Sequence, residues 1–345
     1  MKAYVYDGKD KLGLKDIERP DCKDNTAVIK VKACSVCGTD FRTYTYGSEK
    51  IEPGTVIGHE VTGEIVEIGD KVNDYQVGDQ VNVAPALGCG ECYNCKKGYP
   101  NLCKNLETLG FQYHGGFAEY MEIPAKAFKM GNVIKVETEI EDHIAAVAEP
   151  VACVINAQEF LDIEKGDNVV IFGAGFIGCM HAKLAKSKGA ARVFIVELAE
   201  NRIQQVLELM DDVIVINPQK ENTEDQVNQL TDGEGANVAI TACSAGQAQK
   251  DALEIAAERG RISLFGGLPG ESTGFLDSNL IHYKELSVFG VHASTPEQNR
   301  QALEWISNPE FDLRKFVTTY ALEDIEDAFQ AIEEGKIMKA VVQPQ

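Results

Sequence analysis

The apolar positions of this chain change their spacing along the sequence, and the change predicts stretches of different architecture. Up to about residue 150, short apolar runs are separated by glycine and proline residues. Short runs that are punctuated in this way are typical of an irregular β-barrel. The clearest predicted strands of this stretch cover residues 27–32, 61–68 and 80–83.

A different rhythm holds from residue 167 to about residue 290, where short apolar runs alternate with helical patterns. Strands that alternate with helices favour a parallel sheet with helices on both faces, so the chain is predicted to be an α/β protein. The predicted strands of this sheet cover residues 169–172, 193–196, 213–216, 238–242 and 262–265.

After Pro296 the spacing becomes helical again, over residues 298–306 and 323–334, and it ends in a strand-like run at 340–342. Because this tail lies beyond the predicted parallel sheet, we expect it to fold back onto the first stretch. A length of 345 residues also fits two domains better than one core.

The net charge of the chain argues against some kinds of binding partner. It carries 33 basic and 54 acidic residues, a net charge of −21, which opposes binding to nucleic acid or to an anionic membrane. The N-terminus has no apolar signal segment, and no run approaches the ~18 apolar residues of a membrane span. We therefore predict a cytoplasmic protein whose thiols are reduced.

Four cysteines follow one another closely in a loop rich in glycine at about residues 88–104. They are Cys89, Cys92, Cys95 and Cys103. Four thiolates at this spacing can close around one tetrahedral Zn²⁺, and a site with four protein ligands is structural. Disulfides or unrelated buried thiols are the alternatives, but disulfides need an oxidising compartment.

A glycine motif stands between a predicted strand and a predicted helix over residues 176–188. Its glycines are Gly173, Gly175 and Gly178. In such a loop the first glycine permits the tight turn, the second lets the backbone approach a pyrophosphate, and the third lets helix and strand pack closely. The helix N-terminus then faces the negative charge. A motif of this kind is weak by itself, but its place between strand and helix predicts a dinucleotide site.

The next predicted strand ends in Glu197. A carboxylate at that place accepts hydrogen bonds from the ribose hydroxyls and repels a 2′-phosphate, which favours NAD over NADP. Arg202 leaves the other possibility open, because a nearby arginine can receive a 2′-phosphate.

A second metal site is indicated by a thiol, an imidazole and a carboxylate in the first stretch and at its end, namely Cys37, His59 and Glu149. A catalytic zinc has three protein ligands and one open position. Each residue also has a simpler reading. Cys34 and Cys37 could form a redox pair, His59 could support a turn, and Glu149 could be a surface carboxylate.

These motifs, taken together and in this order, resemble the zinc-dependent medium-chain dehydrogenases of the alcohol, polyol and threonine dehydrogenase type. The resemblance covers the whole chain. It rests on Cys37-Gly-Thr-Asp, Gly58-His-Glu, the four-cysteine lobe, Gly115-Gly-Phe-Ala-Glu-Tyr120, Glu149-Pro150 and the loop of residues 173–178.

The resemblance implies a GroES-like β-barrel catalytic domain, built from residues 1–150 and 291–345, and a Rossmann domain, a doubly wound parallel sheet, over residues 151–290. It places a catalytic zinc on Cys37 and His59 with either Glu60 or Glu149 as the carboxylate ligand. It makes Thr39 the hydroxyl that accepts the substrate proton and relays it. Asp40 becomes the acid that orients the ligating histidine, a common way to fix its tautomer.

The resemblance also implies coenzyme contacts beyond the three glycines. These are Phe176 and Ile177 in the loop, Glu197 and Arg202 after the second strand, and Phe265, Gly266 and Gly267 after the last one. The expected activity is oxidation of a secondary alcohol, such as a polyol, sugar alcohol, cyclitol or polyol phosphate, to a ketone with NAD. The alternatives are a threonine dehydrogenase-like reaction, a zinc-free reductase, or a non-catalytic binding protein that keeps the fold.

One departure bears on the substrate. Many relatives have a histidine five residues after the ligand cysteine, where this chain has Arg42. Arginine stays protonated and cannot shuttle protons. Either water takes over the proton from Thr39, or Arg42 holds an anion. The polar groups expected near the substrate are Arg42, Lys50, His114 and His292, and the two cations leave room for a phosphorylated or acidic substrate. The family also implies a homodimer or homotetramer, with the apolar run 286–291 as the candidate pairing strand.

Overall fold

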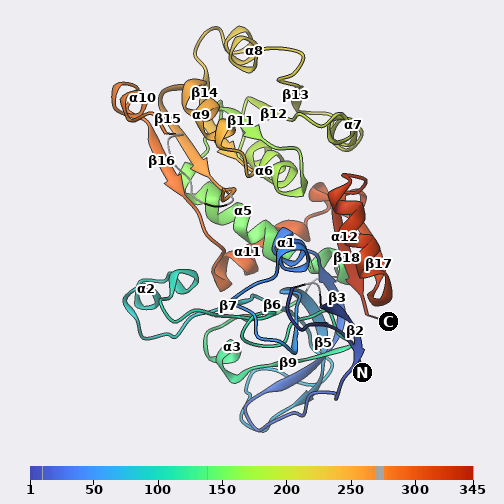
Figure 1. The fold of residues 1–345 in the computed structure, drawn as a ribbon. Coiled ribbons are helices and arrows are strands. Elements are labelled where there is room, and N and C mark those ends of the chain that lie inside the picture. The colour runs from blue at the N-terminus through green and yellow to red at the C-terminus, as the bar shows by residue number, and fades with distance from the viewer. Residues whose placement is uncertain (10, 138, 269, 271–275, 345) are drawn as a thin grey trace. The chain divides into compact units, whose positions relative to one another are not determined.

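The computed structural model describes residues 1–9, 11–137, 139–268, 270 and 276–344, and the chain forms two compact units (Figure 1). Unit 1 comprises Met1–Ala152 and Ala293–Gln345, and unit 2 comprises Cys153–His292. Unit 1 is therefore assembled from two segments of the chain, whereas unit 2 is continuous.

Unit 1 is mainly antiparallel β-structure. Its strands are β1 (Lys2–Tyr6), β2 (Leu12–Asp16), β3 (Ala27–Ser35), β4 (Thr55–Val56), β5 (Glu60–Ile68), β6 (Gln80–Val83), β7 (Ala86–Leu87), β8 (Glu107–Thr108), β9 (Tyr120–Ile123), β10 (Val133–Lys135), β17 (Val317–Ala321) and β18 (Lys339–Gln343). Its main sheet has the order β10-β6-β5-β3-β18-β17, and β9 also pairs with β3. The smaller sheets are β2-β1-β4 and β7-β8.

The helices of unit 1 are short and connect or cover these strands. They are α1 (Gly38–Tyr46), α2 (Tyr93–Lys96), α3 (Ala125–Lys129), α4 (Asp142–Ala145), α11 (Pro296–Ile306) and α12 (Ile325–Glu333), with α5 (Ala148–Leu161) continuing into unit 2. Short 3-10 helices cover Pro100–Leu102, Pro309–Phe311, Arg314–Phe316 and Leu322–Asp324.

The tail of the chain completes the sheet and the core of unit 1, as the sequence predicted. β18 pairs with β3 in antiparallel fashion, and Figure 1 shows this red strand beside blue β3. Phe329 of α12 packs its ring against Tyr4, Phe41 and Tyr44, with ring centroids 5.2–6.3 Å apart. The core thus holds apolar side chains from both ends of the chain.

Unit 2 is a parallel sheet with helices between its strands. The strands are β11 (Asn168–Phe172), β12 (Arg192–Val196), β13 (Ile214–Ile216), β14 (Ala236–Thr241), β15 (Ala256–Leu264) and β16 (Ser287–Gly290). The helices are α6 (Phe176–Ser187), α7 (Glu200–Leu209), α8 (Thr223–Leu230), α9 (Gly246–Glu254) and α10 (Ser278–Tyr283). The strand order is β13-β12-β11-β14-β15-β16, and all of these pairs are parallel.

Helices cover both faces of this sheet, which explains why its strands read as continuous apolar runs. On one face Val170 and Phe172 belong to a core that also holds residues of α8 and α9. On the other face Ile171 lies beneath α6, where a β-carbon at Gly178 would be 3.6 Å from it. The strand order reverses between β11 and β14, and ligands of doubly wound sheets bind at such a switch point.

One stretch of the described chain, Asp142–Leu161, could cross a membrane by length and composition, with a mean hydropathy of 1.3. The sequence prediction overlooked it. This stretch contains α4 and α5, and 83% of its apolar window is buried inside the structure. Burial of this extent is typical of a core helix rather than a lipid-facing one.

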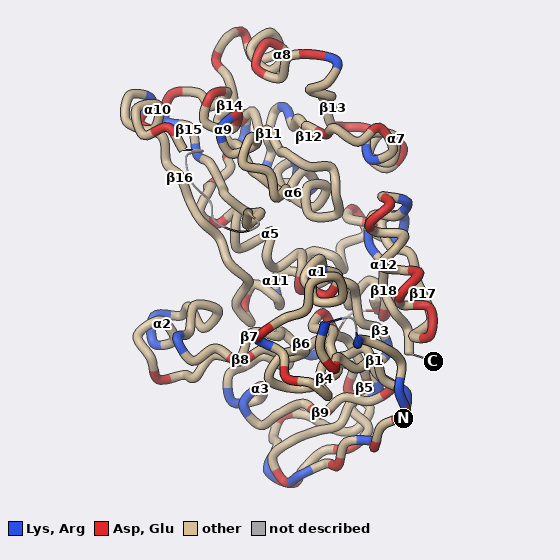
Figure 2. Tube along the Cα trace, in the orientation of Figure 1, with Lys and Arg blue, Asp and Glu red and all other residues tan. Residues whose placement is uncertain are grey.

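The excess of acidic residues is spread over the structure. Figure 2 shows acidic positions along α7, α8 and α12, interspersed with basic ones. Surface ion pairs of this kind contribute little to stability. The net charge of −21 comes instead from the acidic residues in excess of the basic ones.

Candidate active site

Three residues of unit 1 form a group that could hold a metal ion. One potential ligand atom each of Cys37, His59 and Glu60 lies within 4.8 Å of the others. β3 ends two residues before Cys37, and β5 begins at Glu60, so the antiparallel pairing of β3 and β5 brings the two segments together. A thiolate, an imidazole and a carboxylate are suitable ligands for Zn²⁺.

Gly58 allows the chain to turn into this group. Its φ of 94° is a backbone conformation that L side chains rarely adopt, and a β-carbon there would lie 2.8 Å from the ring of Phe117. Any side chain at this position would therefore strain the turn that presents His59.

Asp40 supports both the cysteine and the histidine. Its Oδ2 accepts a hydrogen bond from the backbone N–H of Cys37 at 2.9 Å, and its Oδ1 lies 3.4 Å from His59 Nδ1. With Nδ1 facing this carboxylate, Nε2 is the ring nitrogen left for a metal, the usual arrangement of a ligating histidine. Burial by itself lowers the pKa of His59, but the charges of Asp40 and Cys37 hold that pKa well above its ordinary value.

Glu60 is fully buried and is held by two side chains from other strands. Lys339 of β18 donates to Glu60 Oε2 at 2.6 Å and to the carbonyl of Val36 at 2.8 Å. Ser35 Oγ donates to the same carboxylate oxygen. Burial raises the pKa of Glu60, while Lys339 lowers it.

Glu149 lies near this group without being one of the three residues that could share a metal. It stands in the first turn of α5 with 8% of its surface exposed. Its charge raises the pKa of Glu60 and also that of Lys339, so it acts on the buried pair. The geometry thus supports Glu60 as the carboxylate ligand and leaves Glu149 as a charged neighbour.

The four predicted lobe cysteines also meet at one point. Their sulfur atoms lie within 4.8 Å of one another, with Cys92 3.5 Å from Cys95 and 3.8 Å from Cys103, and Cys89 4.0 Å from Cys95. Four sulfurs placed tetrahedrally at 2.3 Å from zinc are about 3.8 Å apart. The observed separations fit this geometry and are far too long for disulfide bonds.

Backbone amides further prepare the lobe for anionic sulfur. The N–H groups of Cys89 and Asn105 both point to Cys103 Sγ, at 3.2 and 3.3 Å. The backbone N–H of Cys95 lowers the pKa of Cys92 to about 6, whereas burial raises that of Cys95 to about 11. Among the described cysteines none is in a disulfide, so the thiols are available to a metal.

In unit 2 the glycine loop has the shape that the sequence predicted. Gly173 follows β11 and Gly175 precedes α6, with nothing within 4 Å of the place where a β-carbon of Gly175 would lie. A β-carbon at Gly178 would be only 1.9 Å from the carbonyl oxygen of Gly173. The helix therefore packs closely on the loop, and open space remains where a pyrophosphate could approach.

Glu197 is tied to that loop. One of its carboxylate oxygens accepts from the backbone N–H of Ala174 at 2.9 Å, and the other accepts from Leu198 and Ala199 at 2.8 and 2.9 Å. A carboxylate fixed beside the glycine loop is in place to meet the ribose of a dinucleotide. Arg202 lies on α7 and donates to Gln205 at 3.1 Å.

The third segment that the sequence predicted to contact the coenzyme follows β15. Gly266 follows β15 and donates its N–H to Thr241 at 2.8 Å, while a β-carbon there would lie 2.2 Å from the carbonyl of Cys243. Phe265 packs edge-on against His181 of α6, with ring centroids 4.9 Å apart. Phe176 is buried in the first turn of α6, Ile177 beside it is half-buried, and Gly267 is exposed.

Two family models match the chain. Residues 23–138 match the alcohol dehydrogenase GroES-like domain, and residues 177–308 match the zinc-binding dehydrogenase domain. L-threonine 3-dehydrogenase of Yersinia pestis (strain Pestoides F) is 30% identical over 335 residues, which are 96% of each chain. The chain belongs to the zinc-dependent medium-chain dehydrogenase family.

Solved structures of other dehydrogenases agree with this family assignment. The 2R,3R-butanediol dehydrogenase of Bacillus subtilis matches with a TM-score of 0.90 and 27% identity, over 100% of this chain and 99% of that one. A zinc-binding dehydrogenase from Sinorhizobium meliloti 1021, bound to NADP, matches with a TM-score of 0.91 over 99% of each chain. At 24% identity the second likeness shows the shared fold alone.

The remaining polar residues that the sequence singled out occupy different places in the dehydrogenase. Arg42 of α1 donates from Nη2 to Thr39 Oγ1 at 3.0 Å. His114 accepts the backbone N–H of Val56 at 3.0 Å, which is a structural role in its loop. Lys50 is exposed, and His292 is exposed at the end of unit 2.

Sequence reasoning missed two residues at the metal group of the dehydrogenase, Ser35 and Lys339. Both hold Glu60, and neither stands in a motif. A weak signal existed for Lys339, because this lysine directly precedes the apolar run 340–342 in β18; the structure shows that it is only 6% exposed. A buried lysine requires a partner of opposite charge.

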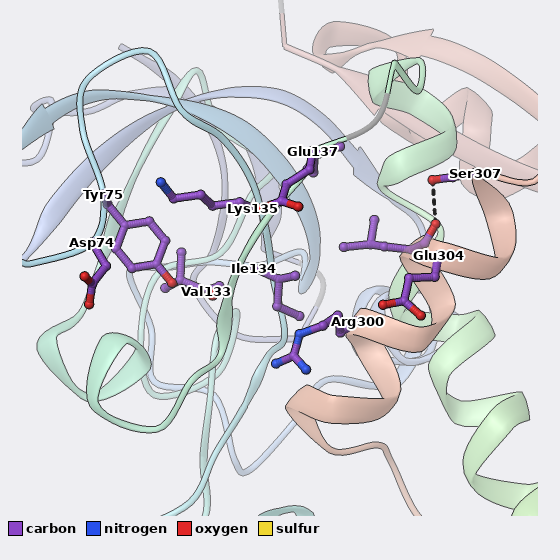
Figure 3. A pocket seen from close by; sticks show the side chains of 11 residues that line it. Asp74, Tyr75, Val133, Ile134, Lys135, Glu137, Arg300, Glu304 and Ser307 are labelled. Atoms are coloured by element: carbon purple, nitrogen blue, oxygen red, sulfur yellow. Dashed lines mark hydrogen bonds between the residues drawn. The ribbon is translucent and has the colours of Figure 1, made fainter.

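A cavity of about 370 Å³ in unit 1 contains none of the metal-group residues (Figure 3). It lies along β10 and α11, with Tyr75, Ile134 and Leu303 among its lining residues. Its cations are engaged, since Lys135 pairs with Asp79 at 2.8 Å and Arg300 pairs with Glu297 of its own helix. We therefore infer no catalytic or binding function from this cavity.

We expect a Cys92→Ser variant to lose about one zinc ion per chain and to melt at least about 5 °C lower in unit 1. Coenzyme binding should stay unchanged, because the glycine loop belongs to unit 2. Metal analysis, thermal unfolding and NAD titration measure the three effects. The control is Cys22→Ser, since Cys22 belongs to neither of the two groups that could hold a metal. A variant with wild-type zinc content and melting temperature would show that the lobe holds no metal.

Proposed function

We propose that this dehydrogenase oxidises a secondary alcohol group of a small polyol-like molecule to a ketone, with NAD as the hydride acceptor. The substrate class includes polyols, sugar alcohols, cyclitols and polyol phosphates. The observation that carries the proposal is the group of Cys37, His59 and Glu60, because three converging ligands leave one position of a tetrahedral zinc open. Bound there, zinc supplies Lewis-acid polarisation of the substrate hydroxyl.

The chain itself supplies positioning and a proton acceptor. Asp40 Oδ1 lies 3.4 Å from His59 Nδ1 and is the carboxylate placed to orient the ring, while Lys339 and Ser35 hold Glu60. One lone pair of Thr39 Oγ1 accepts the N–H of Arg42, and the second can accept a hydrogen bond from the substrate hydroxyl. As Thr39 takes the substrate proton, its own O–H proton passes to water, because Arg42 stays protonated and cannot receive it. We assign Glu60 as the carboxylate ligand and keep Glu149 as the alternative.

Oxidation of L-threonine at its secondary alcohol is the second candidate. It is favoured by the 30% identity to L-threonine 3-dehydrogenase over 96% of both chains. The two candidates share the reacting group and differ in what surrounds it. A threonine enzyme must also grip an α-carboxylate and an amine.

The test is a panel assay that follows NADH by its ultraviolet absorbance at alkaline pH. Hexitols, pentitols, inositols, hexitol phosphates and L-threonine are each offered to the zinc-loaded protein, with and without a chelator. Chelator-sensitive turnover of a polyol supports the leading proposal, and turnover of threonine alone supports the second. Silence across the whole panel, in protein shown to hold two zinc ions, would reject both substrate classes.

We further propose a cytoplasmic homodimer or homotetramer that pairs through β16. This strand lies at the edge of the unit 2 sheet, where unpaired backbone groups can accept another strand. Analytical ultracentrifugation would show a monomer if the proposal is wrong.

We expect Glu197→Gln to reduce the preference for NAD over NADP by at least about tenfold in kcat/KM. The carboxylate beside the glycine loop repels a 2′-phosphate, and like-charge contacts of this kind cost several kcal/mol. Glutamine keeps the size and removes the charge, but its amide has one acceptor oxygen where the carboxylate has two. Either the N–H of Ala174 or the N–H groups of Leu198 and Ala199 therefore lose their partner. Glu200→Gln is the matched control, because Glu200 pairs with Lys220 on the surface. An unchanged ratio would show that Glu197 does not select the coenzyme.

A further inference from the structure

Arg42 places a positive charge one turn into the helix that starts at the metal group. α1 begins at Gly38, directly after Cys37, and carries Thr39 and Arg42 on neighbouring turns. The guanidinium is exposed, and its Nη2 donates to Thr39 Oγ1 at 3.0 Å. The hydroxyl that we assign as proton acceptor therefore has a cation in direct contact.

This guanidinium forms no ion pair with any described carboxylate. Most other arginines of this acidic chain do form one, namely Arg19, Arg259, Arg261, Arg300 and Arg314. The acid nearest to it in sequence, Asp40, is buried and directed at Cys37 and His59 instead. Arginine has five N–H donors, and Thr39 is the hydrogen-bond partner that the described structure gives it.

The other charges around the metal group are unsuited to receiving an anion. Glu60, Asp40 and Glu149 are carboxylates, and the one buried lysine or arginine among the described residues, Lys339, is bound to Glu60 at 2.6 Å. An anionic substituent on a substrate would meet repulsion from these acids unless a further cation faced it. Arg42 is such a cation, and a guanidinium binds phosphate or carboxylate through paired N–H groups.

We propose that Arg42 is a specificity-determining residue that binds an anionic group, a phosphate or a carboxylate, carried by the secondary-alcohol substrate. This inference rests on the proposed function and narrows its substrate class to anionic alcohols. The hydrogen bond from Arg42 to Thr39 keeps the guanidinium beside the Thr39 hydroxyl. The anionic group of the substrate would therefore bind close to the alcohol group that is oxidised.

The experiment compares zinc-loaded wild type with Arg42→Gln and Arg42→Lys on matched substrates. Sorbitol 6-phosphate is paired with sorbitol, and L-threonine is paired with 2,3-butanediol. We expect kcat/KM for an anionic member to fall about 10- to 100-fold in Arg42→Gln, mainly through KM, with partial recovery in Arg42→Lys. The neutral members lose only the hydrogen bond between Arg42 and Thr39, so their kcat/KM should fall at least about tenfold less than that of the anionic members. Lys129→Gln, which removes an exposed cation elsewhere, should change neither.

The two anionic substrates show whether Arg42 binds a phosphate or a carboxylate. A loss confined to sorbitol 6-phosphate assigns a phosphate, and a loss confined to L-threonine assigns a carboxylate. Equal losses for anionic and neutral members would overturn the proposal. A change confined to the KM of NAD would also overturn it, because Arg42 would then serve the coenzyme.

A binding measurement keeps this inference separate from the proposed reaction. Isothermal titration of the zinc-loaded protein with sorbitol 6-phosphate and with L-threonine needs no turnover. Tighter binding of an anion to wild type than to Arg42→Gln supports the assignment even if the panel assay is silent. Equal binding to the two proteins, or no binding of either anion to wild type, rejects it.

Discussion

A Cys37→Ser variant is expected to lose about one zinc ion per chain and at least about a thousandfold in kcat. Zinc stabilises charge that develops on a substrate oxygen by several kcal/mol, and about 4 kcal/mol corresponds to a thousandfold in rate. A serine hydroxyl is a poor substitute for a thiolate, which is a softer and more easily ionised ligand. Metal analysis and the NADH assay measure the two effects.

Two controls test whether the effect is specific to the metal group. Cys22→Ser makes the same change at a thiol outside both metal groups and should keep zinc and activity. Cys37→Ser should also keep its NAD affinity, because the glycine loop lies in unit 2. Full activity in Cys37→Ser would remove the group of Cys37, His59 and Glu60 from the reaction, whatever its metal content.

A Lys339→Met variant is expected to lower the free energy of unfolding of unit 1 by about 3–5 kcal/mol, the usual cost of removing one partner from a buried ion pair. The comparison is made on zinc-free protein, because zinc bound to Glu60 would itself neutralise the carboxylate. Lys339 and Glu60 are 6% and 1% exposed, so in the zinc-free variant the remaining carboxylate would be buried without a cation. The single tryptophan, Trp305 of α11, lies in unit 1, and its fluorescence can follow denaturant unfolding of that unit.

The double variant Glu60→Gln/Lys339→Met tests the cause. Because it removes both charges, it should recover at least about half of the lost stability, as replaced buried pairs often do. Lys336→Met, at an exposed lysine that pairs with Glu334, should leave the unfolding midpoint where it is. A double variant no more stable than Lys339→Met would show that lost packing, and not the unpaired charge, causes the effect.

The features that could be predicted from the sequence are those with local signatures. The parallel strands were predicted to within a few residues, except that β15 begins at Ala256 rather than near residue 262. The glycine loop and the four-cysteine lobe were predicted because their chemistry depends on spacing over a few residues. The short helix α1 was not predicted, since polar residues and glycine conceal its start at Gly38.

What the sequence could not reveal depends on pairing between distant segments. The contact between Lys339 and Glu60 joins residues 279 apart, and it follows from the pairing of β18 and β5 with β3 on either side. No local pattern sets that register. For the same reason the sequence could not distinguish Glu60 from Glu149 as the carboxylate ligand. Only the packed sheet shows that Glu60 lies with Cys37 and His59.

The two-segment construction of unit 1 also fixes an order of events during synthesis. β18 supplies both a strand of the main sheet and the cation that neutralises Glu60, yet it follows all of unit 2 in the sequence. Domains generally fold as units while the chain emerges from the ribosome. Unit 2 can therefore mature first, whereas the main sheet of unit 1 stays incomplete, with the Glu60 carboxylate unpaired by Lys339, until β18 has emerged from the ribosome.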